Sequence, residues 1–231
     1  ADPRLRATEA NGGLLLNGVK GFCSGTRGSQ RLLTTAIHEP TGQMLIAVLP
    51  TETPGITIHD DWDPIGQRQT DSTSVSFDNV PLAWSDVLHR PGAPSSPFRS
   101  LRGLLAQLIL VNLYTGLAQG ALAEARQYTL NEARPWAASG VARAADDPYT
   151  VHRYAEMHLA TTAAAALADS AAQQLQQAWE QGEDLQHEER GQVALASAEA
   201  KVLAHRAALS VGEGVFDVCG ARSARAAQGL D

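Results

Sequence analysis

The chain has 231 residues, of which 44% are hydrophobic and 19% charged, values typical of a globular protein with one large domain or two small ones. Its net charge of −7 disfavours nucleic acid or an anionic membrane as a partner, because both require a basic surface. No apolar run approaches the length of a membrane span, and the two cysteines, Cys23 and Cys219, predict neither a disulfide framework nor a cysteine-based zinc site.

The first part of the chain, residues 1–90, has the pattern of short strands separated by turns. Thr73, Val75 and Phe77 alternate with serines, which predicts a strand with one buried face. The chain begins without Met and enters strand-like sequence almost at once, so we expect it to be a fragment. The strand-like segments are LLLNGVKGF, RLLTTAI, QMLIAVL, GITIHD and TSVSFDNV, bounded by Gly, Pro, Asn or Asp. Consecutive strands without helices between them predict a small antiparallel β domain, either a barrel or a sandwich.

A linker at residues 91–98 separates this domain from a helical part, residues 99–231. Ser96 and Pro97 form a helix start signal, and the pattern that follows predicts a helix to about residue 132. Asp147 and Pro148 repeat the signal, and Gly182 marks the next stop. A third helix is expected from about residue 188 to 218. The fold class is therefore α+β, with the β domain followed by an antiparallel bundle of alanine-rich helices.

The glycine-rich stretch NGVKGFCSGTRGSQ, residues 17–30, has three possible interpretations. A phosphate loop requires Gly-Lys-Ser/Thr before a helix, but the only lysine here, Lys20, precedes the run. A nucleophile elbow requires Gly-x-Ser-x-Gly, a frame that Cys23-Ser24-Gly25 lacks. The remaining interpretation is a strand whose end is open to close backbone approach, and an ordinary strand and turn is favoured on these residues alone.

Two further clusters are candidates for ligand binding. The segment HDDWD, residues 59–63, resembles a site for a hard metal, but it lacks the glycine and distal glutamate of a calcium loop, so a solvated turn is favoured and no metal is expected. Arg134 beside Trp136 is either a helix stop or a place for an anionic aromatic ligand. Arg222 and Arg225 allow the same two interpretations, with solvated surface as the default.

Four segments, taken in order, resemble the acyl-CoA dehydrogenase superfamily. They are LNGVKGFCSGT, IGQRQTDSTSVSFDNVPLAWSDVL, YTGLAQGALAEARQYTLNEARPW and GEGVFDVCGARSA, and they cover most of the chain. Within the superfamily, the segments around ARPW, DDWDPIGQRQT and GARSA are most similar to flavin-dependent monooxygenases, including sulfur-acquisition oxidoreductases and dibenzothiophene monooxygenases. The resemblance implies a central β domain, a C-terminal four-helix bundle and a homotetramer. It also implies an N-terminal helical domain before this chain and a histidine-bearing tail after it.

The resemblance also implies flavin contacts along this sequence. Phe22, Cys23, Ser24 and Gly25 fall where the family places the ring of the flavin, with Phe22 flanking it and the Ser24 hydroxyl near its N5 atom. Ser24 is accordingly the implied catalytic residue. Other implied contacts are Arg134 at a flavin phosphate across a subunit boundary, Trp136 beside it, and the turn Gly220-Ala221 over the cofactor.

One departure from the family pattern separates two activities. Where acyl-CoA dehydrogenases carry an Asp and an Arg for the acyl-CoA, this chain has Leu104 and Gln107, and Ala106 cannot serve as the base that some members carry on this helix. The resemblance therefore implies an FMNH2-dependent monooxygenase that oxygenates a small organosulfur compound through a flavin C4a-(hydro)peroxide. A cytoplasmic location is the default expectation from the two cysteines. A separate reductase would supply the reduced FMN, and molecular oxygen would be the co-substrate. The alternatives are an FAD-dependent acyl-CoA dehydrogenase and a non-catalytic remnant that only oligomerises.

Overall fold

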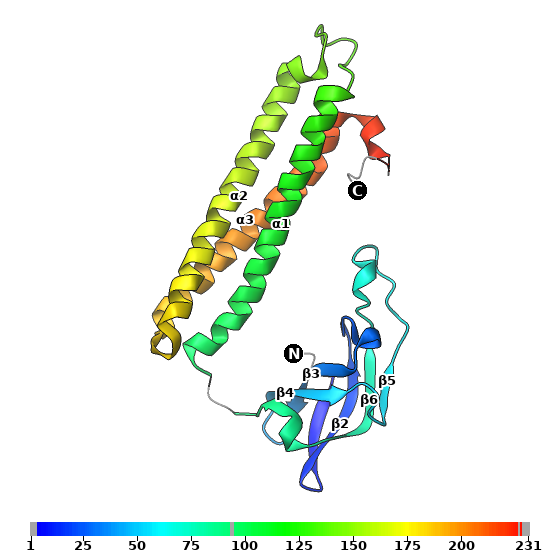
Figure 1. Ribbon diagram of the computed structural model, residues 1–231, viewed down its shortest axis with the longest axis vertical. Helices are drawn as coiled ribbons and strands as arrows, with labels where there is room; N and C mark the ends of the chain where they lie inside the picture. The colour runs from blue at the N-terminus through cyan, green and yellow to red at the C-terminus, as the bar shows by residue number, and fades with distance from the viewer. Residues whose placement is uncertain (1–3, 93–94, 226, 228–231) are drawn as a thin grey trace. The chain divides into compact units, whose positions relative to one another are not determined.

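The computed structural model describes residues 4–92, 95–225 and 227, which divide into two compact units on either side of residues 93–94 (Figure 1). The first unit is built on a single seven-stranded sheet with the strand order β5-β6-β2-β1-β3-β4-β7. Its strands are β1 (Arg6–Ala10), β2 (Gly13–Lys20), β3 (Arg31–His38), β4 (Gln43–Pro50), β5 (Ile56–Ile58), β6 (Val75–Leu82) and β7 (Val87–His89). Short 3-10 helices, η1 (Thr26–Gly28), η2 (Arg68–Thr70) and η3 (Trp84–Asp86), lie in the connections.

The sheet is mixed rather than purely antiparallel, which corrects the expectation in one respect. β1 and β3 are parallel neighbours, joined by the amide of Ile37 donating to Leu5 O at 2.9 Å and that of Glu39 donating to Ala7 O at 3.0 Å. The other strand pairs are antiparallel. The parallel pair arises because β2 lies on one side of β1, and the chain after β2 crosses to the other side before starting β3.

The curvature of the sheet encloses one core. In Figure 1, β3 and β4 run across the direction of β2 and β6, so the sheet coils over on itself. The expected buried face of TSVSFDNV is confirmed, because Thr73, Val75 and Phe77 are at most 3% exposed. The core is mainly aliphatic and includes Leu5, Leu14, Leu16, Leu32, Leu45, Leu49, Val80 and Leu82.

The second unit consists of three long helices, α1 (Pro97–Asn131), α2 (Pro148–Gln181) and α3 (His187–Cys219). Single turns precede α2, follow it and follow α3: η4 (Ala144–Asp146), η5 (Gly182–Asp184) and η6 (Ala221–Ala224). The predicted start signals are confirmed, because Ser96 Oγ accepts from the Arg99 amide at 3.2 Å and Asp147 Oδ1 accepts from the Tyr149 amide at 2.9 Å. α3 begins with a capping box between Gln186 and Glu189.

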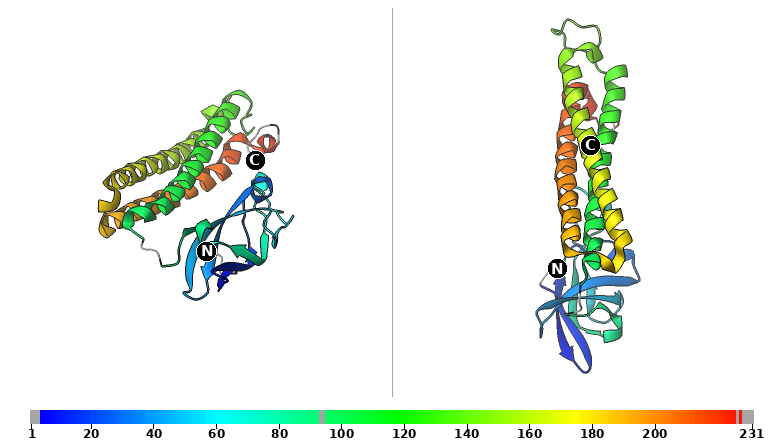
Figure 2. Two further views of the ribbon diagram at one scale, coloured as in Figure 1. Left: turned by 60° about the horizontal axis from the view of Figure 1, so that its bottom comes forward. Right: turned by 90° about the vertical axis from the view of Figure 1, so that its left-hand side faces the viewer.

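Small side chains let the three helices approach closely, as the alanine-rich sequence predicts. Figure 2 shows them running side by side along their length, with α2 opposite in direction to α1 and α3. Alanine is the commonest residue at the buried positions of α2 and α3 taken together, whereas α1 contributes mostly larger side chains. The buried residues include Ala164, Ala168 and Ala171 of α2, Ala200, Ala204 and Ala207 of α3, and Leu101, Leu104, Leu108 and Val111 of α1.

Each helix also leaves apolar side chains exposed in the single chain. Leu105, Ile109, Leu113 and Leu117 recur every four residues along α1 and are 44–63% exposed. Within the described part of the chain, α1 is the one helix long and apolar enough to cross a membrane by length and composition, contrary to the expectation that no run approaches that length. Leu101, Leu104, Leu108 and Val111 belong to the bundle core. α1 therefore has the composition of a helix that packs against further helices on more than one side.

Candidate functional site

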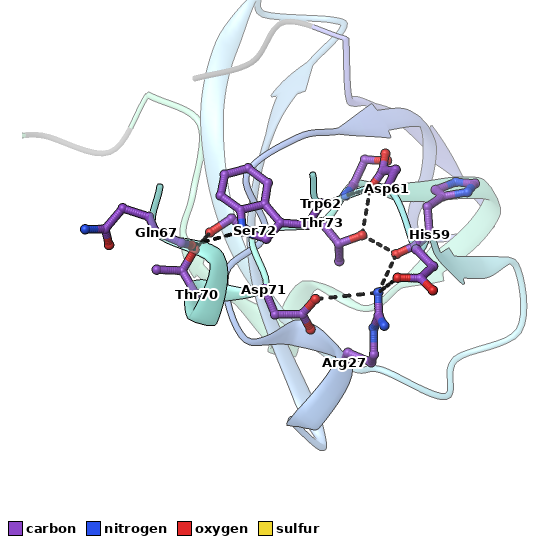
Figure 3. A network of polar contacts seen from close by, with 11 residues as sticks. Arg27, His59, Asp61, Trp62, Gln67, Thr70, Asp71, Ser72 and Thr73 are labelled. Carbon is purple, nitrogen blue, oxygen red and sulfur yellow. Dashed lines mark hydrogen bonds and ion pairs between the residues drawn. The ribbon is translucent and has the colours of Figure 1, made fainter. Parts of the chain in front are cut away.

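An aromatic pair, formed by the exposed Phe22 and the half-buried Trp62, lies where β2 ends. Phe22 has φ +57°, a left-handed conformation that is rare for a bulky residue, and its side chain is 80% exposed. Its ring meets that of Trp62 edge to face, with centroids 5.9 Å apart and planes at 76°. The Trp62 indole Nε1 donates to Gln67 O at 3.1 Å, which fixes that ring's orientation (Figure 3). The pair forms an apolar surface suited to a flat aromatic ligand.

The carboxylate of Asp61 holds the connection between β5 and β6 in place. Its Oδ1 accepts from Thr73 Oγ1 at 2.7 Å and from the Ser74 amide at 2.8 Å, while Ser74 Oγ donates to Oδ2 (Figure 3 shows Asp61 and Thr73). Hydrogen bonds from the hydroxyl and amide of Ser74, and then from Thr73, hold the pKa of Asp61 well below its usual range. Because Trp62 follows Asp61 directly, these bonds also position the backbone from which the Trp62 side chain extends.

Arg27 ties the same connection to the loop that carries η1. Its Nη2 lies 2.7 Å from an oxygen of Asp60 and 3.5 Å from one of Asp71, and it donates to His59 O at 3.3 Å (Figure 3). The hydrogen bond to Asp60 is the main cause of the raised pKa of Arg27. Two of the three carboxylates of the HDDWD segment, those of Asp60 and Asp61, thus make structural bonds. Across the described residues, no group of three or more His, Cys, Asp and Glu side chains could hold a metal ion.

Replacing Asp61 by asparagine is expected to reduce the acid sensitivity of the β unit. The folded-state pKa of Asp61 is depressed, so its carboxylate contributes stability above the ordinary aspartate pKa of about 4, and that stability is lost as the pH falls further. Urea unfolding of wild type from pH 7 to pH 3 should show the loss, and Asp61→Asn should show a smaller one. Asp63→Asn, the same charge change on an exposed residue of the same turn, is the control and should behave as wild type.

The four residues predicted at the glycine-rich stretch differ in their accessibility to a ligand. Ser24 is exposed and its Oγ lies 2.7 Å from Ser72 Oγ, whereas Ser72 itself is buried. Gly25 has φ +70°, with open space where a side chain would be. The Cys23 side chain points inward: its Sγ lies 3.5 Å from Lys20 O, and Cys23 belongs to the hydrophobic core of the β unit. Phe22, Ser24 and Gly25 are therefore available to a ligand, and the Cys23 side chain is not.

A pocket of about 640 Å³ lies at one end of the helical unit and brings together three other predicted residues. Arg134, Trp136 and Gly220 all line it, although 84 to 86 positions separate the first two from the third. Ala221, predicted with them, is not among the lining residues and begins η6. A second arginine, Arg153, also lines the pocket, but ion pairs with Asp217 at 3.0 Å and Glu156 at 3.1 Å engage it. Among the described residues Arg134 has no ion pair, so it is the arginine free to meet an anion.

The positions compared with the acyl-CoA site do not offer that chemistry. Leu104 is buried in the bundle core, and Gln107 Oε1 accepts a hydrogen bond from Lys201. Ala106 is exposed and carries no functional group. The absence of a carboxylate and a guanidinium at these positions removes the polar contacts expected for a CoA thioester.

A family model for the acyl-CoA dehydrogenase C-terminal domain matches residues 108–231, more than half of the chain. The chain belongs to this family. Its predicted family is thereby confirmed, together with the α+β architecture of a β unit and a helical bundle.

This acyl-CoA dehydrogenase family member is similar to two proteins named as monooxygenases and to a third that was solved with FMN bound. "Probable FMNH2-dependent monooxygenase SfnC" of Pseudomonas putida is 42% identical over 231 residues, which is 100% of this chain and 58% of the relative. The structure of methanesulfinate monooxygenase MsuC from Pseudomonas fluorescens is 44% identical with a TM-score of 0.92, over 100% of this chain and 60% of that one. FMN-bound TdsC from Paenibacillus sp. A11-2 is 36% identical with a TM-score of 0.89, again over 100% and 60%.

Sequence reasoning missed the residues that surround Phe22 and Ser24. Asp61 and Trp62 were assigned to a solvated turn, and Arg27, in the glycine-rich stretch, was given no role. Thr70 and Ser72 were not singled out as site residues. The one available signal was the resemblance of IGQRQTDSTSVSFDNV to the family, which covers Thr70 and Ser72 but names no contact for them. The contacts themselves join residues 12 to 48 positions apart, so no local pattern predicts them.

Proposed function

We propose that this chain is the β-domain and bundle part of an FMNH2-dependent monooxygenase that oxygenates a small organosulfur compound. The observation that carries the proposal is the Phe22–Trp62 pair, with Phe22 exposed and Trp62 half-buried, beside the exposed Ser24 hydroxyl. This surface fits a flat ring with polar edge atoms. The relatives support the chemistry, because SfnC is described as FMNH2-dependent and MsuC as a methanesulfinate monooxygenase. The chain spans about 58–60% of the length of those relatives, so the activity of the whole protein is part of the proposal.

The residues present fit two parts of FMN. Phe22 and Trp62 offer apolar surface to the isoalloxazine ring, and Ser24 offers a hydroxyl to its N5 edge. Arg134 offers a free guanidinium to the phosphate, and Trp136 lies beside it in the same pocket. When bound, reduced FMN supplies two electrons, so that one atom of O2 enters the substrate and the other leaves as water. The chain's own residues orient the ring, hold its edge and exclude water around it.

The same proposal includes the partners that such a reaction needs. A separate flavin reductase would supply reduced FMN, and molecular oxygen is the co-substrate. The apolar stripes along α1 and α3 support a homotetramer, because Leu195, Val202 and Leu209 of α3 are exposed at seven-residue intervals in addition to the α1 stripe. A chain with only two cysteines, Cys23 and Cys219, is typical of a reducing compartment, so the proposal extends to a cytoplasmic location.

The test is a flavin titration of the full-length protein followed by reaction with oxygen. Under anaerobic conditions we expect reduced FMN to bind more tightly than FAD. On mixing with 18O-labelled oxygen and methanesulfinate or dibenzothiophene, one labelled atom should appear in the product. Oxidation of an acyl-CoA thioester without label incorporation would instead support a dehydrogenase. A protein that binds no flavin would be a non-catalytic oligomer.

Two substitutions of Phe22 separate its proposed binding role from its backbone strain. Both Phe22→Ala and Phe22→Gly should raise the dissociation constant for FMN about 2- to 10-fold, because each removes the aromatic contact. The glycine variant should be about 1 kcal/mol more stable than the alanine variant, since glycine adopts φ +57° without steric cost. Fluorescence titration and urea unfolding measure the two effects. Leu33→Ala, which removes another exposed side chain of the β unit, should leave FMN affinity unchanged.

A further inference from the structure

Three hydroxyl groups form a chain that leads from a backbone carbonyl to the proposed flavin edge. Thr70 Oγ1 lies 2.8 Å from Gln67 O and 2.8 Å from Ser72 Oγ, and Ser72 Oγ lies 2.7 Å from Ser24 Oγ. Figure 3 shows Gln67, Thr70 and Ser72 at the start of this chain. Ser72 is buried, Thr70 is half-buried and Ser24 is exposed, so Ser24 is the most accessible of the three residues to a ligand.

The carbonyl at one end fixes the direction of every hydrogen bond in the chain. A carbonyl oxygen can only accept, so Thr70 donates its single hydroxyl proton to Gln67 O. The Thr70 oxygen must then accept from Ser72, and the Ser72 oxygen must accept from Ser24. Ser24 therefore donates its hydroxyl proton to Ser72 Oγ, away from the ligand. What it presents to a ligand is an oxygen lone pair.

Backbone contacts hold the two ends of this chain together. The Gly25 amide donates to Thr70 O and to Asp71 O, each at 3.2 Å, and the Cys23 amide donates to Thr73 O at 2.9 Å. Gln67 has φ +55°, and its carbonyl also accepts from the Trp62 indole. The hydroxyl chain and the aromatic pair are thus both hydrogen-bonded to the same atom, Gln67 O. Gln67 itself has a backbone conformation that non-glycine residues seldom adopt.

We propose that Ser72 and Thr70 are positioning residues that make Ser24 a hydrogen-bond acceptor and so give the site a preference for the reduced flavin. Reduced isoalloxazine carries a proton on N5 and can donate to Ser24, whereas N5 of the oxidised ring is an acceptor and would face another acceptor. The inference rests on the proposed function, and it names which redox form of the flavin the β unit selects. No proton or electron transfer is required of the hydroxyl chain.

The experiment compares the affinities of the full-length protein for oxidised and anaerobically reduced FMN. Ser72→Ala frees the Ser24 proton to point toward the ligand, so the preference for reduced FMN over oxidised FMN should fall about 3- to 10-fold. Thr70→Val removes the acceptor for Ser72 and should act in the same direction. The two-electron midpoint potential of the bound flavin should accordingly fall by about 15–30 mV, because a tenfold change in the ratio equals 29.6 mV.

Ser29→Ala is the matched control, since Ser29 lies on the same loop but its hydroxyl bonds to Arg31 O, outside the hydroxyl chain. It should leave the ratio of affinities unchanged. If Ser72→Ala weakens both redox forms equally, the hydroxyl chain is only structural and this inference is overturned while the proposed function stands. If wild type binds FMN in neither form, the proposed function fails and the inference fails with it.

Discussion

Replacing Arg134 by alanine is expected to raise the dissociation constant for FMN about 10- to 100-fold while leaving the affinity for riboflavin nearly unchanged. A hydrogen-bonded pair between a guanidinium and a phosphate contributes about 1.5–3 kcal/mol, and riboflavin has no phosphate to lose. Arg134 is the candidate because the other arginine of its pocket, Arg153, is engaged by Asp217 and Glu156. Fluorescence titration with both flavins, using the full-length protein, measures the difference.

Arg143→Ala provides the matched control, because Arg143 is an exposed arginine in the connection between α1 and α2 and does not line the pocket. It removes the same charge and should change neither affinity by more than about 2-fold, as expected for a solvated surface charge. An equal loss of FMN and riboflavin affinity in Arg134→Ala would contradict a phosphate contact. Such a result would show that Arg134 shapes the pocket instead.

Replacing Gly18 by alanine is expected to cost the β unit about 2–5 kcal/mol of stability. Gly18 has φ +129° at the irregularity of the β2–β6 ladder, and a Cβ there would lie 1.9 Å from Arg4 O and 2.9 Å from Arg4 C. Backbone atoms cannot move aside as a flexible side chain can, so the overpacking cost of 1–3 kcal/mol adds to about 1–2 kcal/mol for the unfavourable φ. Urea unfolding of the full chain should show a lower midpoint for the β-unit transition.

Gly12→Ala isolates the conformational part of that cost. Gly12 also has a positive φ, +77°, but its Cβ would meet nothing within 4 Å. It should therefore lose only about 1–2 kcal/mol. If the two variants unfold at the same urea concentration, the close approach between Gly18 and Arg4 does not limit stability.

The ends of the helices are the part of this protein that the sequence by itself determined. Ser96-Pro97 and Asp147-Pro148 mark starts, and Gly182 and Gly220 follow the last residues of α2 and α3. These signals work because each cap satisfies orphan backbone groups within one turn, so donor and acceptor are close in sequence. The buried face of Thr73, Val75 and Phe77 was predictable for a similar reason, since alternation is a property of one strand.

Both candidate sites, in contrast, depend on contacts that only the tertiary structure decided. Ser24 meets Ser72 across 48 positions, Phe22 meets Trp62 across 40, and Arg134 lines the same pocket as Gly220, 86 residues away. The inward direction of the Cys23 side chain and the parallel pairing of β1 with β3 were likewise decided only by the tertiary structure. A sequence pattern records which face a residue occupies within its own element. It does not record which distant element packs there, because that depends on strand order, register and the path of the connections, and these decide which polar groups find partners.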